Sequence, residues 1–103
     1  MKKFKIVYSP KAVVDRDNLF NTIAYEFHAS QTAIKYIQGI IDEIERLQYF
    51  PEAFPIKPDV HSLMQYGSFV RTITFKKMTI IYTVHDDVVY IHRIVASSLL
   101  ANL

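Results

Sequence analysis

The sequence predicts an α+β fold, with a helical hairpin packed on one face of a mostly antiparallel four-stranded sheet. Between residues 10 and 50, apolar side chains recur at a helical period, whereas between residues 68 and 95 they alternate with polar ones as in strands. A short β-branched segment precedes the helices, so the expected order is β-α-α-β-β-β. The 103 residues are expected to form a single domain, 1–103.

The first strand and the first helix are predicted within residues 4–28. Residues 4–8 are rich in β-branched and aromatic side chains, which favour a strand. Ser9 followed by Pro10 is typical of a helix start, because serine caps the first turn and proline needs no backbone N–H there. The helix is expected to run from about 10 to 28. Its buried stripe is expected to hold Val13, Phe20, Ile23, Ala24 and Phe27, with Asp15, Arg16, Asp17, Asn21 and Glu26 mostly in water.

The second helix is predicted to begin with Ser30 as its cap and to end at Phe50, because a residue before proline avoids the helical region. Its apolar stripe comprises Ala33, Ile37, Ile40, Ile41, Ile44 and Leu47. About two residues separate the helices, so they must form an antiparallel hairpin. Pro51, Pro55 and Pro58 then predict an irregular connection to about residue 67.

The last third of the chain predicts three strands joined by short turns. The expected strands are residues 68–75, 78–84 and 88–95, separated by Lys76-Lys77 and by His85-Asp86-Asp87. In the first of them, alternation places Phe69, Arg71, Ile73 and Phe75 on one face and Val70, Thr72 and Thr74 on the other. In the second it places Met78, Ile80, Tyr82 and Val84 on one face and Thr79, Ile81 and Thr83 on the other.

Composition excludes several classes of protein. The chain has no cysteine, which excludes disulfides and a thiol nucleophile and fits a reducing compartment, so we expect a cytoplasmic location. No apolar run reaches the roughly 18 residues of a membrane-spanning helix, and Lys5 breaks the short apolar start, so neither a membrane span nor a secretory signal is expected. Two glycines provide no phosphate-binding loop, and no cofactor is expected.

Familiar catalytic and metal-binding patterns are missing from the sequence. The four histidines lie in different elements without metal-ligand spacing, so no metal site is expected. Glu43 and Glu45 point about 200° apart on a helix, so they are not a catalytic carboxylate pair. Asp86-Asp87 is explained by a turn, where aspartate is favoured for backbone reasons. No Ser-His-acid triad can be drawn, although Ser97 and Ser98 near the C-terminus are candidates for attention.

Two arginines interrupt apolar strands. An unpaired guanidinium is costly to bury, so Arg71 and Arg93 are expected either to reach a sheet edge or a carboxylate, or to face a surface that binds an anionic partner. Lys76 and Lys77 would extend such a basic patch, unless they are simply solvated turn residues. Residues 60–103 carry four Lys and Arg against two acids, far fewer than the basic stripe of a dedicated nucleic-acid binder.

Five segments in this order resemble the RelE/ParE superfamily of toxins from type II toxin–antitoxin systems, and in particular its ParE-like branch. They are residues 7–12 (VYSPKA), 44–52 (IERLQYFPE), 70–71 (VR), 80–91 (IIYTVHDDVVYI) and 92–95 (HRIV). The resemblance implies the β-α-α-β-β-β fold and a growth inhibitor that binds DNA gyrase and is neutralised by a cognate antitoxin. The candidate target-binding residues are Arg71, Lys76, Lys77, Arg93 and Ser98.

The sequence departs from the family at its tail, where Ala96-Ser97-Ser98-Leu99 replaces a common His-Gly-Arg-Arg ending. One alternative is therefore a non-toxic interaction domain on the same scaffold. Another is a divergent RelE-like mRNA endonuclease that acts at the ribosome with Arg71, His92 and Arg93. The basic strand positions of that branch fall on Val70, Thr72 and Thr79, and threonines cannot stabilise the charge that develops in RNA cleavage.

An antitoxin partner also fits the charge and aromatic content. Eight acids against four bases in residues 12–59 lie between basic ends, and these ends would steer an acidic antitoxin. Two short helices cover only part of a sheet, which would leave some of the seven tyrosines and seven phenylalanines, and the strand 88–95, for a partner. The alternative is that these aromatic residues fill a small core.

Overall fold

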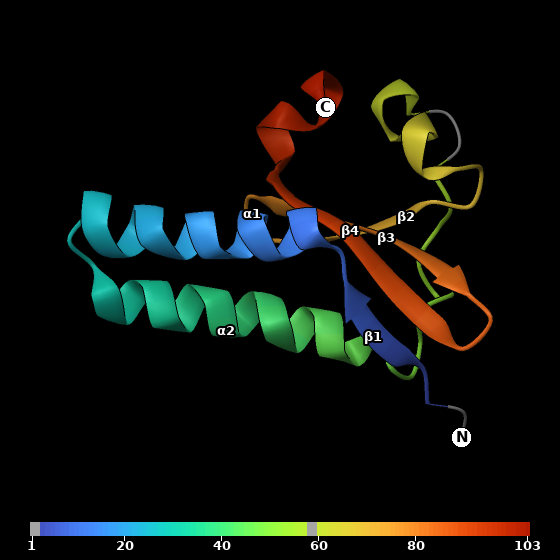
Figure 1. The fold of residues 1–103 in the computed structure, drawn as a ribbon, viewed down its shortest axis with the longest axis horizontal. Coiled ribbons are helices and arrows are strands. Elements are labelled where there is room, and N and C mark those ends of the chain that lie inside the picture. The colour runs from blue at the N-terminus through green and yellow to red at the C-terminus, as the bar shows by residue number, and fades with distance from the viewer. Residues whose placement is uncertain (1–2, 58–59) are drawn as a thin grey trace.

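The computed structural model describes residues 3–57 and 60–103; Pro58, predicted to shape the connection after the second helix, lies outside these ranges. The observed order β-α-α-β-β-β matches the prediction, and short 3₁₀ or π segments are added to it (Figure 1). The elements are β1 (Lys5–Tyr8), α1 (Pro10–Asn21), η1 (Thr22–Glu26), α2 (Ser30–Arg46), η2 (His61–Tyr66), β2 (Arg71–Phe75), β3 (Met78–His85), β4 (Val88–Ala96) and η3 (Ser97–Asn102).

The four strands form one sheet in the order β1-β4-β3-β2. Strand β1 pairs in parallel with β4, from Lys5 opposite Val88 to Tyr8 opposite Ile91, and the other pairs are antiparallel. Over residues 88–91 the last strand is therefore central, and none of its described side chains is exposed, so the expectation that strand 88–95 as a whole stays open to a partner is wrong. Its register with β3 shifts between Ile81 and Tyr82, so His92 is an extra residue at a β-bulge.

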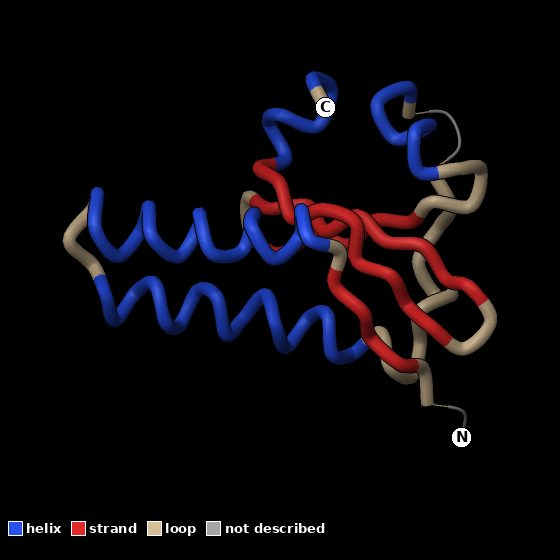
Figure 2. Tube along the Cα trace, in the orientation of Figure 1, coloured by secondary structure: helices blue, strands red, loops and turns tan. Residues whose placement is uncertain are grey.

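The helical hairpin covers one face of the sheet (Figure 2). The alternating strand residues predicted for this face pack against the α2 stripe. This first core contains Phe4, Ala12, Ile37, Ile40, Ile44, Leu47, Ile73, Met78, Ile80, Tyr82, Val89, Ile91 and Ile94. Where α2 passes over β2, the Phe75 ring lies against Gly39, and a Cβ added to this glycine would come within 2.8 Å of ring atom Cε1.

Three helix details differ from the prediction, and one of them is that α2 ends at Arg46 rather than at Phe50. The first helix changes to a π-helical turn at Thr22–Glu26; such a turn contains an extra residue, which rotates the apolar stripe, and Phe27 is 69% exposed. The predicted cap Ser30 is instead the first residue of α2. Ala29 precedes it in the cap position without a side-chain hydrogen bond.

The opposite face of the sheet carries a second, smaller core. It contains Leu63, Val70, Ile81 and Val95, against which Val60, Tyr66, Leu100 and Leu103 pack. Tyr66 and Leu100 belong to the 3₁₀ segments η2 and η3, and Val60 and Leu103 are the residues that flank these segments. The connection after Pro51 is therefore not irregular throughout, and the apolar tail packs on the sheet.

Candidate interaction site at the edge of β4

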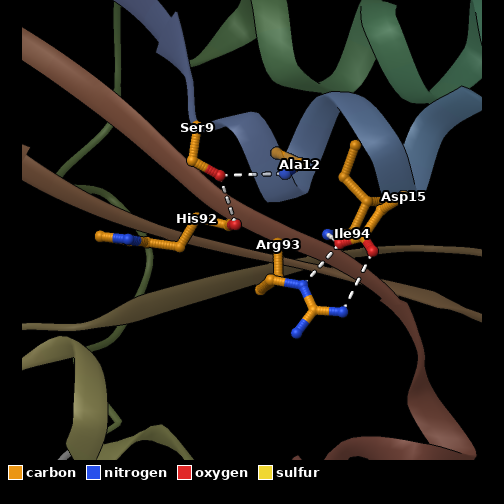
Figure 3. Close-up of polar contacts among 6 residues, drawn as sticks. All are labelled: Ser9, Ala12, Asp15, His92, Arg93 and Ile94. Atoms are coloured by element: carbon orange, nitrogen blue, oxygen red, sulfur yellow. Dashed lines mark hydrogen bonds and ion pairs between the residues drawn. The ribbon is translucent and has the colours of Figure 1, made fainter.

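Ser9 joins β1, α1 and β4. Its backbone N–H donates to the Ile91 carbonyl at 2.9 Å, and its hydroxyl donates to the His92 carbonyl at 2.7 Å (Figure 3). The same oxygen accepts from the Ala12 N–H at 2.9 Å, which confirms Ser9 as the cap of α1, with Pro10 in the first turn. Strand β1 ends at Tyr8 while β4 continues. The start of α1 therefore supplies hydrogen-bond partners to backbone groups at the edge of β4.

Asp15 continues this edge and pairs with Arg93. Its carboxylate accepts from Arg93 Nε at 2.7 Å, from Arg93 Nη2 at 3.0 Å and from the Ile94 N–H at 2.9 Å (Figure 3). The hydrogen bond to Asp15 is the largest contribution that raises the pKa of Arg93. The expectation that Asp15 lies in water is therefore wrong. Of the alternatives for Arg93, the structure shows a carboxylate partner.

Beside this ion pair, α1 and β4 border a shallow groove of about 450 Å³, lined by Pro10, Lys11, Val14, Asp15, Asn18 and Arg93. Val14 is 55% exposed on its wall. Since Arg93 neutralises Asp15, Lys11 leaves a net positive charge. An apolar wall with one free cation can accept an apolar side chain that is followed by an acidic one.

Arg71 lies at the outer edge of the sheet, away from this groove. Its guanidinium donates to the carbonyls of Glu52, at 3.3 Å, and Phe54. The same side chain lines a smaller hollow of about 200 Å³ together with Glu52, Phe69, Val84 and Asp86. Arg71 thus reaches a sheet edge, as one alternative predicted, and it anchors the loop that follows α2.

Lys76, Lys77 and Ser98 lie at one end of the sheet. The Lys77 carbonyl accepts from the Ser97 N–H at 2.8 Å, and the Ser97 hydroxyl hydrogen-bonds Thr79 Oγ1 at 2.7 Å. These bonds hold the β2–β3 turn beside the start of η3. All three candidate side chains are exposed there, although the Lys76 ammonium lies 5.4 Å from the centre of the Tyr36 ring.

The three residues named for an endonuclease do not come together. Arg71 lies opposite Tyr82, whose side chain belongs to the first core, so both are on the hairpin-covered face. His92 bonds the neighbouring Thr83 hydroxyl at 2.8 Å, on the other face. Arg93 is paired with Asp15. This arrangement separates the cation Arg71 from the imidazole.

Six aromatic residues are exposed, in two groups. Tyr25 and Phe27 lie at the end of the hairpin. The other group, Tyr49, Phe50, Phe54 and Phe69, belongs to the loop after α2 and the approach to β2. The expectation of uncovered aromatic residues is therefore confirmed at these positions, while others, such as Tyr82, fill the core.

Within residues 3–57 and 60–103, no helix is long and apolar enough to cross a membrane. Over the same ranges, no three histidine, aspartate or glutamate side chains gather in a way that could hold a metal ion.

The comparison that decides the family covers nearly the whole chain. A sequence model of the family described as "ParE toxin of type II toxin-antitoxin system, parDE" matches residues 6–98. The chain belongs to the ParE toxin family. The matched range contains every strand except the first residue of β1, both helices, and the Asp15–Arg93 pair.

Among solved structures, this ParE family member is similar to a chain titled "Chromosomal ParDE TA system from P. aeruginosa". The TM-score is 0.73 at 20% sequence identity, and the alignment covers 93% of this chain and 98% of the other. At this identity the likeness establishes a shared fold. No curated protein matches the sequence closely enough to count as a relative.

Proposed function

We propose that this ParE family member inhibits growth by binding DNA gyrase and that a cognate acidic antitoxin neutralises it. The observation that carries the proposal is the family match over residues 6–98. The separation of Arg71 from His92 gives no support to RNA cleavage, so binding is the favoured mode of action.

For the target, we propose a contact surface formed by Lys76, Lys77 and Ser98. These side chains are exposed at one end of the sheet, whereas the guanidinium groups of Arg71 and Arg93 already bind protein oxygens. In this proposal the two arginines act by holding the loop after α2 and the start of α1 in place. The exposed lysine side chains can meet an acidic surface on the target.

The test is inhibition of gyrase supercoiling by purified protein. Reversing both charges (Lys76→Glu with Lys77→Glu) is expected to weaken inhibition at least about tenfold, since two attractive contacts become repulsive. Lys35→Glu, which changes another exposed lysine, on α2, is the matched control and should inhibit like the parent. If the parent protein leaves supercoiling unchanged at micromolar concentration, the gyrase proposal is wrong.

For the antitoxin, we propose that an apolar segment with acidic neighbours occupies the groove beside Asp15 and Arg93. Val14→Glu places a charge on the apolar wall and is expected to weaken antitoxin binding at least about tenfold. Ile34→Glu changes a residue of nearly equal exposure, 54%, on α2 and should leave binding intact. Binding is measured by calorimetry with the cognate antitoxin that this proposal requires, and equal effects of the two substitutions would refute the groove assignment.

A further inference from the structure

Two histidines meet on the face of the sheet opposite the hairpin. The Nε2 atom of His85 and the Nε2 atom of His92 each lie 2.8 Å from the hydroxyl oxygen of Thr83. The two nitrogens therefore cannot be farther apart than twice that distance. Thr83 is almost fully buried, whereas His85 is exposed at the end of β3. One fixed hydroxyl thus gathers two imidazoles.

The hydrogen bonds restrict the protonation of the two rings. A hydroxyl has one proton, so at most one of the two nitrogens accepts it, and the other must donate an N–H to the oxygen. When that ring proton moves from Nε2 to Nδ1, the Nε2 atom carries a lone pair, as the Nε2 atom of the other ring already does. Burial, and to a smaller degree the neighbouring His85, lower the pKa of His92, which favours the neutral form of its ring.

Aromatic packing fixes one of the two ligands. The His92 ring packs against the rings of Tyr66 and Tyr90, with 4.8 Å between ring centres in each pair. The β-bulge at His92 directs the side chain to this face. His85, exposed and at a strand end, has room to move the remaining distance, and together the two rings offer one rigid ligand and one adjustable ligand.

We propose that His85 and His92 form a two-imidazole site for a divalent late first-row transition metal ion, such as Cu²⁺, Ni²⁺ or Zn²⁺. Imidazole nitrogens are ligands of these ions at about 2 Å, and hard ions such as Mg²⁺ prefer oxygen. Over the described residues no third histidine or acid joins the pair, so water would complete the coordination. The ion would link the end of β3 to the bulge of β4.

The site is invisible in the sequence because His85 and His92 are seven positions apart, in different strands. Only the short β3–β4 turn, together with the extra residue at the bulge, brings the two side chains to the same threonine. Spacing rules for metal ligands within one helix or one loop therefore do not find it.

Calorimetric titration of the tag-free protein with CuCl₂, NiCl₂, ZnCl₂ and MgCl₂ tests this proposal, with imidazole NMR signals in the ZnCl₂ titration identifying the ligands. We expect one saturable site, tightest for CuCl₂ and undetectable with MgCl₂. His85→Gln or His92→Gln should weaken binding at least about tenfold. His28→Gln and His61→Gln, which replace the other two histidines, are the matched controls and should bind like the parent.

Loss of structure cannot imitate the expected result at His85, because this side chain is exposed at a strand end. Circular dichroism tests whether each variant is folded before titration. If the His92→Gln variant is unfolded, the test rests on the His85→Gln variant. The absence of saturable binding up to millimolar metal would overturn the proposal. So would a His85→Gln variant that binds as tightly as the parent, or a His61→Gln variant that loses as much.

Discussion

The two faces of the sheet are built differently. The hairpin-covered face packs one continuous apolar core, with fully buried residues such as Ile40, Ile80 and Ile91. The opposite face combines four buried apolar residues with threonine and histidine side chains, under two short 3₁₀ segments. A large apolar core supplies most of the stability of a small domain, whereas polar groups on a thinly covered face are available for binding.

This difference also separates the apolar scaffold of the fold from the sites proposed for partners. The ion pair of Asp15 with Arg93 lies at the boundary between the faces, where α1 replaces β1 beside β4. The lysines of the β2–β3 turn and the histidine pair belong to the end and the thinly covered face of the sheet. Substitutions on the two faces should therefore separate stability from binding.

The largest effect is expected in the first core. Ile40→Ala removes a fully buried side chain between α2 and the sheet, and should lower the free energy of unfolding by about 4 kcal/mol. Leu63→Ala, in the second core, should cost about 2 kcal/mol, because the 3₁₀ cover can settle into the space. Urea denaturation measures both, and equal losses would remove the distinction between the two faces.

The next effect concerns the boundary between the faces. Asp15→Ala leaves Arg93 and the Ile94 N–H without their acceptor, at an expected cost of about 2–3 kcal/mol. Asp15→Asn keeps an oxygen for the Ile94 N–H and should cost less. Thermal unfolding of the Asp15→Ala, Asp15→Asn and Arg93→Met variants, and of Arg93→Met combined with each Asp15 substitution, measures the coupling between the two side chains. Additive losses from Asp15→Ala and Arg93→Met would show that the pair contributes nothing.

A smaller effect is expected where α2 crosses β2. On an open helix, Gly39→Ala would stabilise by about 1 kcal/mol, but here the new methyl group meets the Phe75 ring. We expect a net loss of about 1–2 kcal/mol from overpacking. Phe75→Leu in the same chain should recover part of this loss, as measured by urea denaturation. A stabilised Gly39→Ala protein would mean that the ring moves aside freely.

The smallest effect is a pH dependence confined to the second face. The lowered pKa of folded His92 means that the unfolded chain, with an ordinary value of 6.5, binds more protons below neutral pH. The free energy of unfolding should therefore fall as the pH drops through 6.5 towards the lower folded value. His92→Gln should flatten this slope, and His61→Gln should retain it. Denaturation curves at a series of pH values give both slopes.

Much of the fold follows from local patterns in the sequence. Ser9 and Pro10 mark the start of α1, and alternation assigns Ile80 and Tyr82 to the first core, because capping and burial depend on nearby residues. The π-helical turn has no comparable signal, and it moves Phe27 from the predicted stripe into solvent. The packing of the apolar tail depends on Ile81 and Val95, which lie under it only in the folded sheet.

The candidate sites were less predictable, because their partners are distant in sequence. Asp15 and Arg93 are separated by 78 positions, and the periodicity of α1 assigns Asp15 to the solvent side. The sequence limits Arg71 and Arg93 to a few alternatives, and the carbonyls of Glu52 and Phe54 that bind Arg71 are backbone groups, which carry no residue signature. The shared position of Lys77 and Ser98 likewise depends on the register of β3 with β4.

The parallel pairing of β1 with β4 also determines when the protein can fold during synthesis. The first strand finds its partner only in residues 88–91, at the far end of the chain. Pairing of such distant segments is slow, and the N-terminus of a chain emerges from the ribosome first. The sheet therefore cannot close before residues 88–91 have left the ribosome, so a growing chain has no complete sheet until β4 is available to β1.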